Sequence, residues 1–523
     1  MPASAKCMID ARRLVAPREH YGVLVEPDAA GIHACLARDA AAGYDAVPIL
    51  DTTLGALRAR LRRRLDLAGP VILTGHQAGF GHAGVFAKTI AADALAAGAG
   101  GVTVFLTVDS DVPKSRQLAV PRVEDDQLKR MFVDVPGCDT RLPSEWQPEV
   151  GAEEWAGFFA RVRSLWSGSG DSLLQAFVDG WLAAARLKPG FCDGMVGAHA
   201  AVEKALGLAR TRDVRASQLC TTPEFRAFVA HLALRAPAFT AHYNQAQLAY
   251  RQRYGVRNIL RPAPLLHVSP DRTELPFWVS RRGQARCRLY VTGHGDAVEF
   301  FADDEPIALL PESRLACAEY HTDPWPIEAD GWHIRLRALT LSAFARLLLA
   351  DLFIHGIGGA KYDRMTEDFV QHFFGVELAP MCCVSATMHL PLPQNGVSQG
   401  DVRAARRASR DIRYNPQRYL PNPPGDLLRR REELIQESAA LKATRSHDHA
   451  ARARVFQEIR RLNDQLLRCD PARADDFNQR VGWLEEQWRQ DRIALDREYF
   501  FALHRRSDME RLVQGVRAQL ALR

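Results

Sequence analysis

The stretch from Val71 to Lys88 combines glycine, histidine and lysine in an order that suits anion binding: Val-Ile-Leu-Thr-Gly-His-Gln-Ala-Gly-Phe-Gly-His-Ala-Gly-Val-Phe-Ala-Lys. Glycines let a ligand approach the backbone closely, and a helix that begins behind them directs free N–H groups at the turn. Histidine changes charge near neutral pH, so His76 is a candidate catalytic acid or base. The candidate ligands of a phosphate or another anion are Thr74, Gly75, Gln77, Gly79 and Lys88.

Two acidic residues form a second candidate group. Asp109 and Asp111 directly follow the apolar run Val102–Val108, which is expected to be a buried strand. Ligands of open α/β sheets bind beyond the carboxyl ends of the strands. These carboxylates are therefore candidates for a catalytic base, for binding ribose hydroxyls or for holding Mg²⁺. The structural alternative is that Asp109 caps a turn and that Asp111 lies in a loop before Pro113.

A third group lies in residues 354–363, which read Ile-His-Gly-Ile-Gly-Gly-Ala-Lys-Tyr-Asp. Three glycines and a lysine, between a buried helix expected over 341–353 and another over 365–374, indicate a second ligand-facing loop. An arginine before the first of these helices is a candidate partner of a substrate carboxylate. The candidate binding residues of this half are Arg337, Gly356, Gly358, Gly359 and Lys361.

The first glycine segment belongs to an expected strand–helix–strand unit. The run Val71–Leu73 predicts a buried strand, residues 87–97 a helix, and Val102–Val108 a second strand. Strands joined in this way are parallel. A further strand is expected over 376–384. Two glycine segments in one core suggest two halves of a doubly wound α/β sheet that face a shared cleft.

The chain is expected to divide near residue 420. Residues 1–420 would form the α/β core, with an insertion of amphipathic helices at about 120–235, and residues 421–523 a helical domain that includes a helix over 481–506. In that domain apolar residues recur at heptad or helical spacing, at Leu427, Leu434 and Leu441 and at Val455, Ile459, Leu462 and Leu466. This pattern predicts an antiparallel helical hairpin, through which two copies of the chain could form a homodimer.

Composition limits the classes of function. The net charge of +6 is small for 523 residues, and the run Arg58–Arg64 is interpreted as a solvated helix face, so no nucleic acid partner is expected. Residues 1–20 lack the apolar segment of a secretory signal, and no apolar run reaches the ~18 residues of a membrane span. The 10 cysteines contain no C-x-x-C spacing, so no metal ligand set is expected. A cytoplasmic protein with no membrane partner is the simplest interpretation.

Two short motifs leave other enzyme classes open. Residues 79–84 (Gly-Phe-Gly-His-Ala-Gly) match the G-x-G-x-x-G fingerprint of dinucleotide sites, with Asp109 as the acidic ribose partner. However, five residues separate Leu73 from Gly79, whereas the fingerprint usually follows its strand at once. Residues 82–85 (His-Ala-Gly-Val) match in part the HxGH signature of nucleotidylyl transferases, with Val85 in place of the second histidine.

Taken in order, these motifs resemble those of the bacillithiol-biosynthesis cysteine-adding enzyme family. Residues 74–79, with Lys88 and Asp109-x-Asp111, are similar to that family's TGQQ loop and acidic EDHD-type motif. Residues 356–361, 373–377 (Phe-Phe-Gly-Val-Glu) and 385–387 (Ser-Ala-Thr) are similar to its glycine loop, its HFGIE stretch and its SAT stretch. In this chain His76 replaces the family's first glutamine, and Val108 and Ser110 replace its glutamate and histidine.

The resemblance implies a Rossmann-like core, a C-terminal coiled-coil hairpin and a ligase that joins cysteine to the amine of glucosaminyl malate. It implies a small anionic substrate held by Lys88, Arg337 and Lys361, with His76, Asp109 and Asp111 as the catalytic residues. The acid must be activated, and ATP or ADP with Mg²⁺ is the cofactor class that suits this step. The alternative is a non-catalytic binding or scaffold protein, which the loss of the glutamate and histidine beside Asp109 favours.

Overall fold

A computed structural model describes residues 9, 13–166, 168, 170–208, 212–260 and 263–521. The chain forms two compact units: the first contains residues 1–120, 131–390 and 497–523, and the second contains residues 121–130 and 391–496. The helical unit begins at residue 391, earlier than the expected division near residue 420, because it also contains the helix Gln399–Tyr414. Residues from Arg497 onwards return to the first unit, where they pack against its core.

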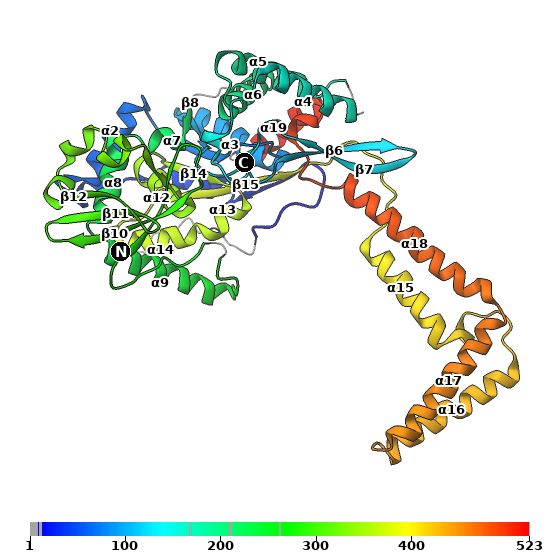
Figure 1. The fold of residues 1–523 in the computed structure, drawn as a ribbon. Coiled ribbons are helices and arrows are strands. Elements are labelled where there is room, and N and C mark those ends of the chain that lie inside the picture. The colour runs from blue at the N-terminus through cyan, green and yellow to red at the C-terminus, as the bar shows by residue number, and fades with distance from the viewer. Residues whose placement is uncertain are drawn as a thin grey trace. The chain divides into compact units, whose positions relative to one another are not determined.

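The first unit is built on a six-stranded sheet with the order β1-β15-β14-β4-β5-β8 (Figure 1). Its strands are β1 (Gly22–Glu26), β4 (Val71–Gln77), β5 (Val102–Val108), β8 (Arg212–Arg215), β14 (Leu352–His355) and β15 (Met381–Thr387). Strand β1 is antiparallel to β15, and the other neighbours are parallel. The predicted α/β class with a parallel-strand sheet is thus confirmed, with one antiparallel edge strand added.

The predicted strand–helix–strand unit is present as β4, helix α3 (Ala83–Ala99) and β5. Strand β4 is longer than expected, so Gly75, His76 and Gln77 belong to the strand and not to the turn. A Cβ atom on Gly75 would lie 2.3 Å from the carbonyl oxygen of Leu106 on β5. Glycine at this position therefore allows the two backbones to approach closely and does not form a turn.

Helices cover both faces of this sheet. Val104 and Leu106 share one core with α2 (Leu54–Arg64), α12 (Ala338–Leu348) and α14 (Arg364–Phe374). Phe105, which lies between them in β5, points to the opposite face because successive strand residues alternate. On that face α3 packs against β4, β5 and β15, and α19 (Arg506–Leu520) packs against α3.

Several expected boundaries were wrong. The helix expected over 341–353 is α12 followed by β14, because a short apolar run fits a buried helix and a buried strand equally well. The expected glycine loop folds into the short helix α13 (Ile357–Tyr362), and the strand expected over 376–384 is β15. The helix expected over 481–506 ends at Ala494, and α19 begins at Arg506.

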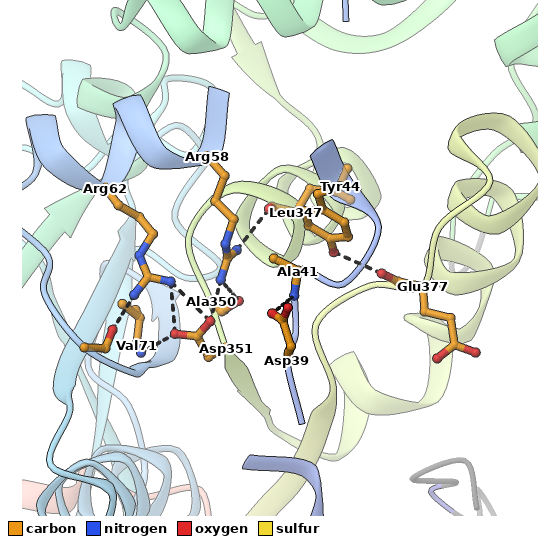
Figure 2. A network of polar contacts seen from close by, with 11 residues as sticks. Asp39, Ala41, Tyr44, Arg58, Arg62, Val71, Leu347, Ala350, Asp351 and Glu377 are labelled. Carbon is orange, nitrogen blue, oxygen red and sulfur yellow. Dashed lines mark hydrogen bonds and ion pairs between the residues drawn. The ribbon is translucent and has the colours of Figure 1, made fainter. Parts of the chain in front are cut away.

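The amino ends of β4 and β14 are joined through Asp351, which immediately precedes β14 (Figure 2). Its carboxylate accepts a hydrogen bond from the backbone N–H of Val71 at 2.7 Å and ion pairs from Arg58 at 2.5 Å and Arg62 at 3.0 Å. Arg58 also donates to the carbonyls of Leu347 and Ala350. The interpretation of residues 58–64 as a solvated face was therefore wrong for these two arginines, which lock α2 and β14 to the start of β4.

The expected helical insertion is more mixed than predicted. It contains the hairpin β6 (Gln117–Glu124) and β7 (Gln127–Asp134), helices α4 (Ala152–Leu165), α5 (Leu174–Leu187), α6 (Phe191–Ala205), α7 (Ala216–Leu219) and α8 (Pro223–Ala233), and the edge strand β8. An antiparallel sheet follows with the order β12-β11-β10-β9-β13, built from β9 (Thr273–Arg281), β10 (Cys287–His294), β11 (Ala297–Ala302), β12 (Glu305–Pro311) and β13 (Trp332–Leu336).

Shorter or peripheral elements complete the first unit. They are α1 (Ala29–Leu36), β2 (Pro48–Ile49), β3 (Thr52–Thr53), α9 (Ala236–Tyr254), α10 (Glu312–Leu315), α11 (Pro326–Ala329) and the 3₁₀ turns Tyr44–Ala46, Ser144–Trp146, Ala318–Thr322 and Phe501–Leu503.

The second unit consists mainly of helices α15 (Gln399–Tyr414), α16 (Gly425–Thr444), α17 (His449–Arg468) and α18 (Pro471–Ala494). Helices α16 and α17 pack through Leu434, Val455 and Leu462, with Leu427, Leu441 and Ile459 beside them. The heptad pattern thus predicted both helices and their contact. None of the helices in the described part of the chain has the length and apolar character that crossing a membrane requires.

Substitution of Gly75 by alanine is expected to destabilise the first unit by about 2 kcal/mol or more, because the new methyl group would meet backbone that cannot move without disturbing β5. The matched control is Gly79→Ala, since no atom lies within 4 Å of a Cβ at that position. Urea denaturation of both variants measures the difference. Equal stability of the two variants would contradict the close-approach role of Gly75.

Candidate functional site

The candidate residues of both halves of the sequence meet along one edge of the main sheet. Residues 78–82 follow β4, Asp109–Asp111 follow β5, Gly356 follows β14, and residues 385–387 end β15. These four strands are neighbours and run parallel, so their carboxyl ends lie at the same edge. The strands that precede the two glycine segments, β4 and β14, pair with each other, and the cleft expected between the two halves stays a prediction.

The chain direction across the sheet reverses between β4 and β14. From β4 the chain passes through α3 to β5 on one side, and from β14 it passes through α13 and α14 to β15 on the other. Such a switch point leaves a crevice beyond the strand ends, where open α/β sheets bind their ligands. The strand order therefore contains the switch point that a binding site shared by the two glycine segments would require.

Strand β14 is shorter than its neighbours at this switch point. It ends at His355, opposite Cys383, whereas β15 continues to Thr387 and β4 continues to Gln77. The side chain of Lys88 reaches this edge of the sheet from α3. Its ammonium group donates a hydrogen bond to the carbonyl oxygen of Gly75, and its Cδ lies 3.8 Å from the position of a Cβ on Gly356.

Lys88 is a buried cation at the sheet edge. Its side chain is almost fully excluded from solvent, and burial lowers the pKa of Lys88 to about 8. The thiol of Cys383 lies nearby, and burial raises the pKa of Cys383 to about 12 despite the positive charge of Lys88. The amine can therefore exchange a proton near physiological pH, and an anion beside it would stabilise its charged form.

The two histidines of the first glycine segment are uncharged at neutral pH. Burial, together with the charge of Lys88, lowers the pKa of His76 to about 3, and its Nδ1 lies 3.0 Å from the carbonyl oxygen of Gln77. Burial, together with the charge of Arg497, lowers the pKa of His82 to about 4. The Nδ1 of His82 accepts a hydrogen bond from the N–H of Gly84 and caps α3. The expected proton exchange of His76 near neutral pH was therefore wrong, because a buried ring between cations holds its proton weakly.

The carboxylate of Asp109 is engaged by the start of α7. It accepts hydrogen bonds from the backbone N–H of Ser217 at 2.8 Å and from the Ser217 hydroxyl at 2.5 Å. Burial raises the pKa of Asp109, while these hydrogen bonds oppose the rise. Asp109 lies at the end of β5, as predicted. Its carboxylate accepts hydrogen bonds at the start of a helix, which is closer to the capping role than to the binding role.

Asp111 lies at the centre of a polar chain that links the sheet edge to the antiparallel sheet. It accepts hydrogen bonds from the side-chain amide of Gln77 and, at 2.7 Å, from Arg286. The guanidinium group of Arg286 lies over the ring of Trp278 on β9, 4.7 Å from its centroid. Arg286 thus orients the carboxylate of Asp111, and this carboxylate orients the side-chain amide of Gln77.

The other predicted binding residues have different surroundings. Thr74 is buried and donates to the carbonyl oxygen of Ile354, which joins β4 to β14. Arg337 lies apart from the glycine segments, where it pairs with Glu274 at 2.7 Å and stacks on Trp278. Gly358 lies in α13 with open space around its Cβ position, Gly359 packs closely against His355, and Lys361 is exposed. Gly356 is the residue of this group that lies beside Lys88.

Sequence reasoning missed a strap, which we define as Arg497–Leu503. The N–H of Phe501 donates to the carbonyl oxygen of Gly81, and Phe500 forms a β-bridge with His82. Arg497 donates to the Ser385 hydroxyl and to the carbonyl oxygen of Ala386. The strap thereby covers the turn before α3. No local signal marks these residues, because they lie more than 400 positions from the turn in the sequence.

A cavity lies beside His76 on the α3 face of the sheet. Its lining contains residues of β4, β5, α3, α6 and the strap: His76, Gln77, Ala78, Gly79, Gly81, Val85, Phe86, Thr89, Phe105, Thr107, Met195, Val196, His199 and Phe501. The ring of His199 on α6 lies among Phe86, Phe105 and Phe501 at the cavity wall. No sequence pattern connects α6 with this site.

Among the described residues, no three His, Cys, Asp or Glu side chains are grouped so that they could hold a metal ion. Comparison with known protein families finds none that matches this chain, and comparison with curated proteins finds no similar sequence.

Lys88 is expected to titrate near pH 8, and a bound carboxylate anion is expected to raise its pKa, because the anion favours the charged amine. NMR of lysine labelled with ¹³C at Cε would follow this titration, with the Lys88→Met variant identifying the signal. A Lys88 signal that titrates above pH 10 in the free protein would contradict the buried position of its amine.

Acid is expected to destabilise the fold between about pH 6.5 and pH 3. His76 and His82 take up protons near pH 6.5 in the unfolded chain and only at pH of about 3 and 4 when folded. The stability that neutral rings contribute is present above pH 6.5 and is lost as the pH falls, by about 1.4 kcal/mol for each unit of pKa difference.

Urea denaturation at pH 7.5, 6.0 and 5.0 measures this loss. The variants His76→Gln and His82→Asn should show a weaker pH dependence, whereas substitution of the exposed His447 by glutamine should leave it unchanged. If both variants lose stability with acid as steeply as the parent chain, the titration belongs to other groups.

Proposed function

We propose that this chain is a divergent relative of the bacillithiol-biosynthesis cysteine-adding enzymes, a ligase that forms an amide between cysteine and the amine of a small anionic substrate such as glucosaminyl malate. One observation carries the proposal. Four of the sequence islands that resemble the family (residues 74–79, 109–111, 356–361 and 385–387) lie at or just after the carboxyl ends of the adjacent strands β4, β5, β14 and β15, whereas residues 373–377 precede β15. Islands far apart in the sequence thus meet at one edge of the sheet.

The proposal includes a Rossmann-like core followed by a coiled-coil hairpin. Support for the core comes from the parallel strands, from the reversal of chain direction between β4 and β14, and from the helices on both faces. Support for the coiled coil comes from the heptad-spaced leucines at the contact of α16 with α17. A homodimer through this hairpin is part of the same proposal.

Lys88 is the group we assign to the anionic end of the substrate. It is a cation in a site with little water, where a carboxylate gains more from a charged partner than it would in bulk solvent. His76 is neutral, so its role is to exchange hydrogen bonds with an uncharged part of the substrate. Asp109 and Asp111, engaged by Ser217 and Arg286, hold the end of β5 and orient Gln77 at the cavity wall.

ATP with Mg²⁺ would supply an activated carboxyl group, but the described residues do not form a site that fits them. The carboxylates nearest the crevice, Asp109 and Asp111, already bind Ser217 and Arg286. The helix end at α3, where a phosphate would bind, is capped by His82 and covered by the strap. We therefore assign no step to a nucleotide or a metal ion.

A non-catalytic binding protein is the second candidate. It is favoured because the carboxylates of Asp109 and Asp111 are already bound by Ser217 and Arg286.

The dinucleotide-dependent enzyme and the nucleotidylyl transferase have less support. Strand β4 ends at Gln77, close enough to Gly79 for the dinucleotide fingerprint, but the strap lies over that turn. The same contacts cover the residues that match the nucleotidylyl transferase signature, and Val85 lines the cavity in place of its second histidine.

The proposal predicts that glucosaminyl malate raises the melting temperature of the purified protein. At about a hundred times its dissociation constant a ligand stabilises the folded state by roughly 2.7 kcal/mol. The shift should disappear in Lys88→Met, which preserves the buried shape, and persist in Lys188→Gln, which changes an exposed lysine.

Mass spectrometry of reactions that contain cysteine and glucosaminyl malate, with and without ATP and Mg²⁺, would then detect the amide. A ligand-induced shift without product would favour the binding protein. Stabilisation by a nicotinamide dinucleotide would replace the ligase by the dinucleotide enzyme, and transfer of the nucleotidyl group of ATP to an acceptor, with release of pyrophosphate, would replace it by the nucleotidylyl transferase. Product formation by Lys88→Met at the parent rate would overturn the role of Lys88.

A further inference from the structure

The helical unit contains an open cavity of its own, beside helices α15 and α18, which pack against each other (Figure 1). Its volume is about 470 Å³, within the range that ligand sites of proteins commonly have. The lining consists of Arg130, Arg406, Glu485, Trp488, Arg489, Arg492 and Ile493. All of these residues belong to the helical unit, and arginines outnumber the single glutamate, so positive charge dominates the surface.

Most of the lining comes from one face of α18. Glu485, Trp488, Arg489, Arg492 and Ile493 follow one another at the spacing of the stripe that a helix normally buries against its neighbours. Here none of the five side chains is buried, and the two arginines are exposed. This face of α18 is therefore open to a second molecule.

Two of the arginines retain hydrogen-bond donors. Arg406 uses its Nε to bind Glu485 at 2.6 Å, and its two terminal amino groups have no partner among the described residues. The guanidinium group of Arg492 lies over the ring of Trp488, 5.2 Å from its centroid, and forms no ion pair within the described part of the chain. Such paired N–H groups bind both oxygens of a carboxylate.

The ion pairs at the cavity indicate which class of anion fits it. Arg130 pairs with Asp496, and Arg489 pairs with Glu486, so carboxylates already match the arginines around the opening. The carboxylate of Glu485 lies in the wall itself, where it repels a ligand with closely spaced negative charges, such as a polyphosphate or a nucleic acid backbone. Ile493 adds apolar surface. A ligand with separated carboxylates and an apolar group is thus complementary to the lining.

Positive charge continues along α15. Arg403 and Arg410 lie one turn before and one turn after Arg406, and both are exposed. Their printed neighbours are uncharged: Arg403 donates to the side chain of Gln399, and Arg410 lies over the ring of Tyr414. An extended acidic ligand would therefore meet further positive charge beyond the cavity, which speeds association and weakens as salt is added.

We propose that this cavity docks an acidic segment of a partner protein, with Asp or Glu side chains on Arg406 and Arg492 and an apolar side chain against Trp488 and Ile493. Tryptophan and arginine are among the residues that most often dominate the binding energy of protein interfaces. This docking surface is additional to the proposed ligase and does not depend on it.

The test uses a short fluorescein-labelled peptide of glutamate and leucine residues, titrated with the full-length protein and followed by fluorescence anisotropy. The peptide should bind at about 50 mM salt and more weakly at about 200 mM, because salt screens exposed charges. Arg492→Ala and Trp488→Ala should each weaken binding by at least about fivefold. The matched controls Arg480→Ala and Trp483→Ala change exposed residues of the same helix outside the lining and should leave the affinity unchanged.

Arg492 is exposed and makes no ion pair in the described residues, so Arg492→Ala should fold even if Trp488→Ala does not. The proposal is overturned if the acidic peptide does not bind, if a peptide of lysine and leucine binds as tightly, or if the controls weaken binding as much as the cavity variants. Tighter binding of inorganic polyphosphate or of a single-stranded oligonucleotide would also reject the acidic segment. The readout requires no catalysis, so its result is independent of the ligase.

Discussion

The short pairing between β4 and β14 is the constraint on which the rest of the first unit depends. Only Ile72–Thr74 of β4 and Leu352–Ile354 of β14 pair with each other, yet this pairing joins segments 280 residues apart in the sequence. Asp351 keeps this pairing in register at the amino ends of the two strands. Its carboxylate accepts a hydrogen bond from the backbone N–H of Val71, the first residue of β4, and pairs with Arg58 and Arg62 of α2. Breaking a buried arrangement of this kind leaves charges without partners, which makes alternative registers costly.

The carboxyl ends of the same strands carry a buried positive charge. Strand β14 stops at His355 while β15 and β4 continue, and the amine of Lys88 reaches the carbonyl oxygen of Gly75 from α3. Burial is the main cause of the lowered pKa of His76 and of His82, and the charge of Lys88 adds to it at His76 and that of Arg497 at His82. The electrostatic character of the edge is thus a result of burial as much as of residue type.

The sequence was most informative where periodicity and position agree. Strand β5 and helix α3, the place of Asp109 at a strand end, and the contact of α16 with α17 all follow from local patterns. It was least informative for residues whose role depends on a distant partner. Arg58 looks like one arginine in a charged run, and only Asp351 explains its burial.

The same limit applies to the candidate site. Gly75 was correctly identified as unusual, but its purpose is close packing on Leu106 and not a turn. Asp109 lies at the end of a strand, as expected, but no local sequence pattern identifies Ser217 as the partner of its carboxylate. The walls that complete the cavity, such as Met195 and Phe501, come from segments whose proximity only the tertiary structure determines.

The strap has a consequence for how the protein is made. Residues 497–503 complete the wall over the turn before α3, and in the chain they follow the whole helical unit. During synthesis on the ribosome, the first 390 residues can emerge and form their sheets, but Phe80 and Phe86 remain without their partners Phe500 and Phe501. The nascent core therefore exposes an aromatic surface until residues 497–503 have also been synthesised, which makes it prone to association during that interval.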